Sequence, residues 1–519
     1  MPARGRSPCG NIKKMNAQFI TRVRVVTALC VLVTIVIIGR LYLLQIIHGD
    51  EYARRADAQS VELKNPLLNR GAIYFSAKDG ALLTAATLSD LSTTTGHQRY
   101  YPGGSLAAQT LGFVAYNNDH EQKGRYGLER YYEQTLARTS TESYSNFFVE
   151  LFGGLASGLV GEGGQGDLIT TIEPAVQAEL ERTLATYGTQ WNPAFSGGII
   201  MDPMNGEIVA MALSPSFDLN TFNQPHDVRI FGNPLVEGAF EMGSIIKPLT
   251  MAAGLDSGSV TEATTYNDTG CIELEQKKIC NFDGKARNTV PMQEVLSQSL
   301  NLGSAFVASK IGPDIMRNYF LTRYKLGEET GIDLPSEAHG LTGNFKSPRQ
   351  VEYATMAFGQ GISLTPVETV RALASLGNGG LLVTPHLVRA IKYQNGVIAT
   401  KTWAEGEQIL KPETSTAISR MLTKVVDEAL AGGSLKMEHY SVAAKTGTAQ
   451  VADPVNGGYY TDRFLHSFFG YFPSFAPKFV VFLIANEPTG ATFASQTWAP
   501  PFGSLVKFLI NYYNIPPDR

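Results

Sequence analysis

A long apolar run near the N-terminus is the first clear pattern along the chain. Residues 25–39 carry no charge, and after Arg40 the apolar character continues to Ile47. A helix needs about 20 residues to cross the hydrocarbon core of a bilayer, and an arginine near one end can extend its charge toward the headgroups. The run is longer than the apolar part of a cleaved signal peptide, and no small-x-small cleavage site follows it. It therefore predicts a transmembrane helix over residues 23–47.

The charges on either side of this run predict its orientation. Six basic residues precede residue 25, and no acidic residue precedes Asp50. Because positively charged flanks stay on the cytoplasmic side of a membrane, residues 1–22 are expected to form a cytoplasmic tail. Everything after His48 is then expected on the outer side of a bacterial cytoplasmic membrane that the chain crosses once.

The next stretch mixes short apolar segments with turn signals, a pattern typical of a small mixed domain. A glycine-rich segment at residues 153–166 predicts a boundary. The apolar residues 147–152 before it fit a strand, a partner-binding loop or a membrane-touching patch, and the role of residues 147–160 stays open. We assign residues 48–170 to a first exported domain.

Longer elements are predicted in the rest of the chain. The pattern indicates a short strand over residues 168–171 and a helix over Pro174–Tyr187. Residues 196–213 form two β-rich runs joined by an Asp-Pro-Met-Asn-Gly turn, which is a strong hairpin signal. A second domain, residues 190–519, is therefore expected to begin its sheet with antiparallel strands.

Length and composition narrow the class of protein. A chain of 519 residues is expected to form two or three folded units, and 44% hydrophobic with 17% charged residues fits a protein that folds mostly in water. The formal net charge is −4, and no basic stripe occurs outside the first 24 residues. Nucleic acid is therefore not expected as a partner.

Four cysteines fit the predicted topology. Cys9 falls on the cytoplasmic side and Cys30 in the membrane span, which leaves Cys271 and Cys280 in the exported part. These two flank a segment whose polar and apolar residues alternate as in a hairpin. An oxidising exterior favours a disulfide across it, and two unrelated thiols are the alternative. Neither cysteine has a histidine at metal-ligand spacing, so no metal site is expected.

Candidate chemistry begins at Ser244-Ile-Ile-Lys247. On a helix these two positions share one face, so the lysine amine can reach the serine hydroxyl. A place in the first turn would also direct backbone N–H groups at a developing oxyanion. A lysine can act as the base only if burial or a neighbouring cation lowers its pKa. The same pattern recurs at Ser504-Leu-Val-Lys507, which we interpret as part of an amphipathic helix over residues 502–513.

A second motif, Ser299-Leu-Asn301, follows a helical stretch that starts at Pro291. Its serine supplies a hydroxyl for proton relay, and its asparagine supplies an amide that can hold a peptide carbonyl. Alone, so short a pattern is more often a turn than a site.

A third motif, Lys445-Thr446-Gly447-Thr448, is predicted to form a strand at the edge of a site. Lys445 and the two threonine hydroxyls can bind a substrate carboxylate. Gly447 would let a substrate backbone approach closely. The N–H groups of Thr448 and Ser244 can together form an oxyanion hole.

In the order Ser-x-x-Lys, Ser-x-Asn, Lys-Thr-Gly, the three motifs form the signature of penicillin-interacting serine enzymes. The chain resembles a class B penicillin-binding protein of the FtsI type over nearly its whole length. The segments that resemble this family outside the three motifs are residues 69–74, 99–108, 127–130 and 359–366. Leu300 in place of a serine and Glu173 in place of an aspartate depart from its usual pattern.

This resemblance implies the architecture and the partners. A single N-terminal transmembrane helix is followed by an α+β pedestal (dimerisation-like) domain and an α/β penicillin-binding (transpeptidase, β-lactamase-like) domain whose central antiparallel sheet is flanked by helices. No cofactor is implied. The implied partners are peptidoglycan stem peptides, β-lactams, the cytoplasmic membrane, a SEDS-type glycosyltransferase and other division or elongation proteins. Too few residues separate the anchor from the second domain for a glycosyltransferase domain, so one activity is expected.

The implied activity is peptidoglycan D,D-transpeptidation through an acyl-enzyme on Ser244. Lys247 would act as base, Ser299 and Lys445 would relay protons to the leaving amine, and Asn301 would orient the acyl chain. A role in division is expected, with an elongation-specific transpeptidase as the alternative. A β-lactam sensor, a β-lactamase and a catalytically idle scaffold are the rivals from other classes.

Overall fold

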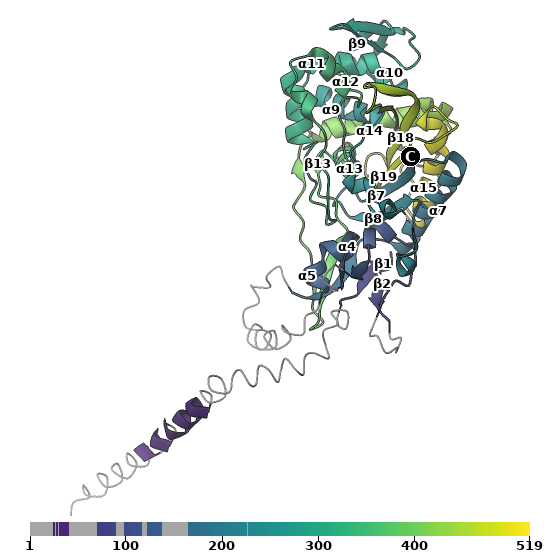
Figure 1. The fold of residues 1–519 in the computed structure, drawn as a ribbon. Coiled ribbons are helices and arrows are strands. Elements are labelled where there is room, and N and C mark those ends of the chain that lie inside the picture. Colours follow the sequence, from purple (N-terminus) through teal and green to yellow (C-terminus); the bar gives the residue numbers. More distant parts are fainter. Residues whose placement is uncertain are drawn as a thin grey trace, which may run out of the picture. The chain divides into compact units, whose positions relative to one another are not determined.

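The computed structural model describes residues 24–25, 27–29, 31–40, 70–89, 98–116, 122–137, 164–225 and 227–519 (Figure 1). The chain divides into two compact units, residues 1–66 and residues 67–519. In the first unit, the described residues between 24 and 40 are helical and expose apolar side chains. Within the described ranges, no helix has the length and apolar character needed to span a bilayer. The predicted span lies partly outside these ranges, and residues 147–160 lie wholly outside them.

A five-stranded antiparallel sheet forms the centre of the second unit, in the order β17-β18-β19-β7-β8. Its strands are β7 (Phe195–Met201), β8 (Ile208–Ser214), β17 (Ala443–Ala452), β18 (Tyr459–Phe472) and β19 (Phe479–Asn486). β7 and β8 form the predicted hairpin, with Ser196 opposite Ser214. β19 is apolar almost throughout because both of its faces are buried. The antiparallel sheet expected from the sequence is confirmed.

Four helices cover the two faces of this sheet: α7 (Pro174–Trp191), α13 (Pro366–Ala374), α14 (Pro412–Lys424) and α15 (Ala494–Tyr513). Side chains alternate along β18, and two neighbouring residues show which helices lie on which face. Gly470 lies against Phe502 of α15, whereas the hydroxyl of Tyr471 bonds to that of Ser419 of α14 at 2.9 Å. The helices predicted over residues 174–187 and 502–513 are confirmed, since α7 extends past Tyr187 and residues 502–513 form the last part of α15.

The other α-helices and β-strands of this domain are α8 (Pro234–Glu237), α9 (Lys247–Asp256), β9 (Thr265–Asp268), β10 (Cys271–Leu274), β11 (Lys277–Cys280), β12 (Asn288–Pro291), α10 (Met292–Ser297), α11 (Asn301–Arg317), α12 (Gln350–Met356), β13 (Leu381–Leu382) and β16 (Glu407–Gln408). β10 and β11 form a hairpin, and a disulfide joins Cys271 to Cys280 across it. The structure thus contains the disulfide that the sequence suggested.

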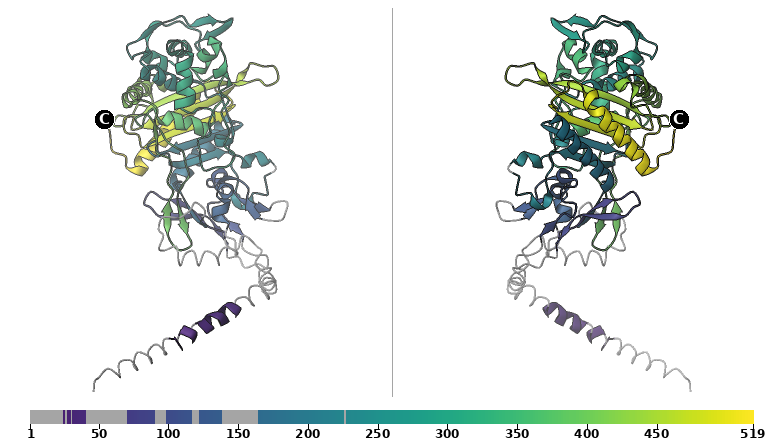
Figure 2. Two further views of the ribbon diagram at one scale, coloured as in Figure 1. Left: turned by 90° about the vertical axis from the view of Figure 1, so that its left-hand side faces the viewer. Right: turned by 90° about the vertical axis from the view of Figure 1, so that its right-hand side faces the viewer.

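A six-stranded sheet, in the order β15-β14-β6-β1-β2-β3, forms the other end of the second unit (Figure 2). Its strands are β1 (Ile73–Ser76), β2 (Leu82–Leu88), β3 (Arg99–Tyr100), β6 (Gly166–Thr170), β14 (Val388–Tyr393) and β15 (Ile398–Thr400). The smaller elements near it are α3 (Ala108–Leu111), β4 (Val114–Tyr116), β5 (Gln122–Gly124), α4 (Gly127–Tyr131) and α5 (Glu133–Leu136). β14 pairs antiparallel with β6. Two strands from the second predicted domain therefore complete the sheet of the first, which local patterns did not predict.

A buried charge network holds this smaller region together. Glu129 is fully buried, and its two carboxylate oxygens accept hydrogen bonds from Arg70 Nε and Arg99 Nε, both at 2.7 Å. Arg70 also pairs with Glu133 at 2.8 Å. Burial favours the neutral acid, but the two guanidinium groups outweigh it and hold the pKa of Glu129 below its ordinary value. The carboxylate is thus charged and paired on both sides.

Glu129→Ala is expected to destabilise the folded chain by about 3–5 kcal/mol, because it leaves two buried guanidinium groups without their shared partner. The midpoint of urea unfolding measures the loss. Glu179→Ala is the control, since Glu179 pairs only with the exposed Arg182, and it should cost much less. Equal losses of unfolding free energy in the two variants would show that the buried network stabilises the fold no more than the exposed ion pair does.

Candidate active site

Ser244 lies in the 3₁₀ turn Gly243–Ile246, which leads directly into α9. Gly243 has a φ of 64°, and a Cβ on this residue would lie 2.9 Å from the carbonyl oxygen of Thr448. Glycine is therefore required at this turn. The N–H of Gly243 donates to the carbonyl of Gly359 at 3.1 Å, which places one of the family-like segments against the Ser244 turn. The predicted position of Ser244 at a helix start is confirmed.

Lys247 begins α9 and is 1% exposed. Its burial, together with the charge of Lys445, lowers the pKa of Lys247 well below its ordinary value. Its Nζ donates to Oδ1 of Asn301 at 2.8 Å and to the carbonyl oxygen of Ser299. A neutral amine can donate its two N–H bonds to these two carbonyl oxygens and keep its lone pair for a proton from Ser244.

Ser299 lies between the two buried lysines of the site. Its backbone is in the left-handed region, with a φ of 55°, at the junction of α10 and α11. Its Oγ accepts a hydrogen bond from Lys445 Nζ at 2.9 Å and lies 3.2 Å from Lys247 Nζ. Burial lowers the pKa of Lys445 to about 7. The three groups form a short path along which a proton can pass.

The third motif lies on β17, where side chains alternate between the cavity and the interior. Thr446 and Thr448 are half-buried and line the cavity, whereas Lys445 and Gly447 are buried. A Cβ on Gly447 would clash with the Ser467 hydroxyl and the carbonyl of Met242. The space beside this glycine is thus filled by the protein itself. Glycine at position 447 lets β17 lie against the turn that carries Ser244. This structural role is additional to the predicted close approach of a substrate backbone.

A cavity of about 1050 Å³ opens in front of these motifs. Ser244, Ser299, Asn301, Thr446 and Thr448 line it, and the other three predicted residues, Lys247, Lys445 and Gly447, lie directly behind. All eight predicted site residues are therefore brought together. The walls also include residues that no motif indicated, among them Lys277, Phe282, Arg349, Tyr459 and Phe493. These come from separate segments, so only the folded chain identifies them.

Ser504 and Lys507 lie elsewhere. Both are exposed on α15, and neither lines the cavity. The interpretation of this second Ser-x-x-Lys match as part of an ordinary amphipathic helix is confirmed. Among the residues that the structure describes, no group of three or more His, Cys, Asp or Glu side chains could hold a metal ion.

The fold and this serine–lysine site define the class of active-site-serine proteins that interact with penicillin. A protein-family model described as the penicillin binding protein transpeptidase domain matches residues 196–506. The chain belongs to this family.

Curated relatives are similar in sequence, and a solved structure is similar in fold. Stage V sporulation protein D of Bacillus subtilis is 29% identical over 435 residues, which are 81% of this chain and 65% of that protein. The chain thus matches less than two thirds of this relative's length. A peptidoglycan D,D-transpeptidase FtsI homolog of Mesostigma viride is 28% identical over 456 residues, 81% of this chain and 74% of that protein. Penicillin-binding protein 3 of Mycobacterium tuberculosis, in complex with aztreonam, shares the fold, with a TM-score of 0.75, 22% identity and coverage of 87% and 97% of the two chains.

Proposed function

We propose that the chain is a peptidoglycan D,D-transpeptidase that cross-links stem peptides through an acyl-enzyme on Ser244. The observation that carries this proposal is that Ser244 lines the cavity and that the buried Lys247 follows it by one turn. Burial and the charge of Lys445 lower the pKa of Lys247, so the amine is available as a base near neutral pH.

In the acylation step, Lys247 Nζ takes the hydroxyl proton of Ser244, and Oγ attacks the carbonyl carbon of the penultimate D-Ala. The backbone N–H groups of Ser244 and Thr448 bind the oxyanion that forms. The C–N bond to the terminal D-Ala then breaks. Lys247 passes the proton it has taken to the leaving nitrogen through Ser299, which lies between Lys247 and Lys445, and becomes neutral again.

In the transfer step, the amine of a neighbouring stem peptide attacks the ester carbonyl and loses its proton to Lys247. The bond to Ser244 breaks, and Oγ regains a proton, so the enzyme returns to its starting state. Water as the acceptor would give a carboxypeptidase instead. A β-lactam would acylate the same serine because its strained amide presents a carbonyl to the same groups.

The remaining predicted residues are assigned to substrate binding. Thr446 and Thr448 present hydroxyl groups to the cavity beside the buried Lys445, a set that suits the carboxylate of the terminal D-Ala. Asn301 lines the same cavity and is suited to orient the acyl chain. Gly447 keeps this strand close to the Ser244 turn.

We also propose that residues 23–47 anchor the chain once in a bacterial cytoplasmic membrane, with the catalytic domain on the outer side. In support, the described residues between 24 and 40 are helical, and their large apolar side chains are about half or more exposed, as Val25 (63%) and Ile37 (53%) show. Such a surface is stable only against lipid or another apolar partner. A SEDS-type glycosyltransferase in the same membrane is the proposed partner, at division rather than elongation.

A reconstitution assay tests the proposed activity. The full-length chain in detergent micelles is incubated with peptidoglycan strands whose stems end in D-Ala-D-Ala, and released D-Ala and cross-linked stem dimers are counted. The two products should appear in equal amounts, and neither should appear with Ser244→Ala. D-Ala without dimers would indicate a carboxypeptidase. Absence of both products, together with absence of a penicillin adduct, would indicate an idle scaffold, and a stable adduct without either product a sensor.

A further inference from the structure

The disulfide-closed hairpin β10–β11 forms one wall of the active-site cavity and is fixed at both of its ends. At its open end Cys271 and Cys280 are directly paired and bonded to each other. At its turn, the carboxylate of Glu275 accepts the backbone N–H groups of Gln350 and Val351, at 3.1 and 3.3 Å, at the start of α12. The hairpin is therefore held at both ends, and these contacts fix the position of its last residue, Cys280.

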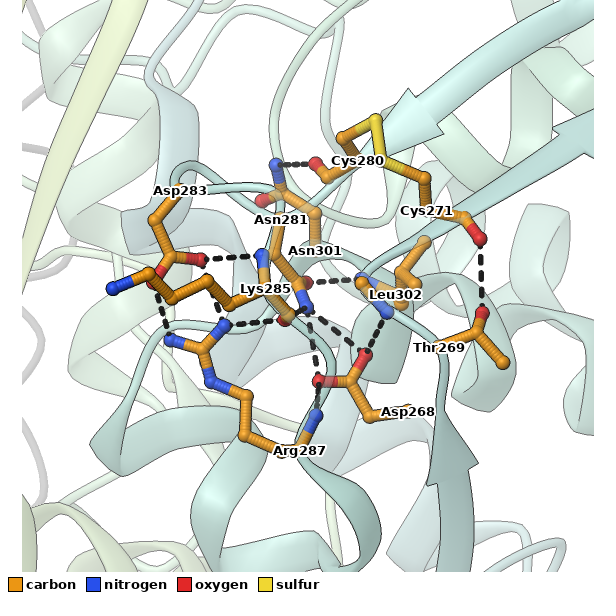
Figure 3. Close-up of a disulfide and its surroundings, with 11 residues drawn as sticks. Asp268, Thr269, Cys271, Cys280, Asn281, Asp283, Lys285, Arg287, Asn301 and Leu302 are labelled. Atoms are coloured by element: carbon orange, nitrogen blue, oxygen red, sulfur yellow. Dashed lines mark hydrogen bonds and ion pairs between the residues drawn. A yellow bond between two sulfur atoms is a disulfide. The ribbon is translucent and has the colours of Figure 1, made fainter.

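Cys280 contacts the site directly. Its carbonyl oxygen accepts a hydrogen bond from Nδ2 of Asn301 at 2.9 Å (Figure 3). Oδ1 of the same amide accepts from Lys247 Nζ at 2.8 Å. An amide turned the other way would set donor against donor at Lys247 and acceptor against acceptor at Cys280. The Cys280 carbonyl thus decides which end of the Asn301 amide faces the lysine.

The next residue supports the same helix. Oδ1 of Asn281 accepts the backbone N–H of Leu302 at 3.2 Å, and so caps the first turn of α11, whose own N-cap residue makes no side-chain bond. Nδ2 of Asn281 donates to both oxygens of Asp268, at 2.9 and 3.0 Å. Asp268 is 1% exposed and also accepts the backbone N–H of Arg287 at 3.1 Å. The Asn281 side chain therefore has a fixed orientation (Figure 3).

We propose that the Cys271–Cys280 disulfide and the Asp268–Asn281 pair form a positioning unit that aims the Asn301 amide at Lys247. This inference rests on the proposed function, because it concerns the base of the acylation step. Two consecutive residues, 280 and 281, hold the first two residues of α11, and the disulfide prevents β11 from moving away from them. Without the cross-link, Asn301 loses its fixed acceptor, and Lys247 loses one of the two carbonyl oxygens that orient its lone pair toward Ser244.

The test measures the rate constant for acylation of the full-length chain by a fluorescent penicillin. Reduction of the folded protein with a phosphine should slow acylation about tenfold, and reoxidation should restore the rate. The Cys271→Ser/Cys280→Ser double variant should be slow to the same degree and insensitive to the reductant, which also controls for the two N-terminal cysteines. Thr269→Ala is the matched control, because Thr269 bonds to the Cys271 carbonyl and not to Asn301. It should acylate at the wild-type rate.

A double-mutant cycle separates positioning from general loosening of the fold. If the disulfide acts through Asn301, the cysteine variant should add no further loss of rate in an Asn301→Ala background. An equal loss in both backgrounds would overturn the inference, as would an unchanged rate on reduction at a temperature where melting curves show every variant folded. In either case a long-lived adduct on the oxidised wild type leaves the proposed function standing. If the wild type forms no adduct, the proposed function fails and this inference fails with it.

Discussion

Replacing Ser244 with alanine is expected to abolish the covalent adduct with a fluorescent penicillin, whereas Ser504→Ala is expected to leave it unchanged. Both serines stand three residues before a lysine, so the sequence pattern alone treats them alike. The structure separates them. Ser244 lines the large cavity and precedes a buried lysine whose pKa is lowered, while Ser504 and Lys507 are exposed on α15. Only Ser244 therefore has both a base and a place for a substrate.

Intact-mass measurement on the full-length chain decides between the two serines. Wild type and Ser504→Ala should each gain the mass of one penicillin, and Ser244→Ala should gain none. A melting curve shows whether Ser244→Ala is folded, which is expected because the change removes one hydroxyl from a half-buried turn. An adduct that persists in Ser244→Ala would place the nucleophile elsewhere. An adduct on the wild type that clears within seconds would favour a β-lactamase.

The part of the site that could be predicted from sequence is the part in which neighbours along the chain are also neighbours in space. Ser244 and Lys247 are one turn apart, and Thr446 and Thr448 are two residues apart on a strand, so their spacing already shows that they share a face. The Cys271–Cys280 hairpin is local in the same sense, since the paired positions are separated by only nine positions in the sequence. In each case the local pattern was enough.

The rest depends on pairings between distant segments. β14 adds to the sheet that contains β6 although more than two hundred residues separate them, and nothing in the apolar pattern of β14 indicates that partner. The left-handed backbone of Ser299 and the contact between Gly447 and the Met242 carbonyl exist only after the sheet and the helices have packed. The same holds for Asn281, whose sequence context is an ordinary turn. Its contacts to Asp268 and α11 appear only in the folded chain.

Lys247→Arg is expected to slow acylation by penicillin by roughly 10²–10⁴-fold, the usual contribution of a general base. The change keeps a basic side chain in place but removes the base, because a guanidinium stays protonated at every pH used for the assay. In the wild type, burial and the charge of Lys445 lower the pKa of Lys247, which favours the neutral amine over the protonated form. Protonation should inactivate it, and the wild-type rate should therefore fall as the pH drops through this lowered pKa.

The rate constant for acylation, measured by stopped flow from about pH 5 to 9, checks both parts of this prediction. The arginine variant should be slow throughout and should lack the part of the acid limb that protonation of Lys247 gives the wild-type profile. Lys507→Arg makes the same exchange in the second Ser-x-x-Lys pattern, on an exposed helix face, and should match the wild type at every pH. If Lys247→Arg kept the wild-type rate, the proton of Ser244 would have to pass to another group. The Ser299 hydroxyl, which accepts a hydrogen bond from Lys445, would then become the leading candidate for the base.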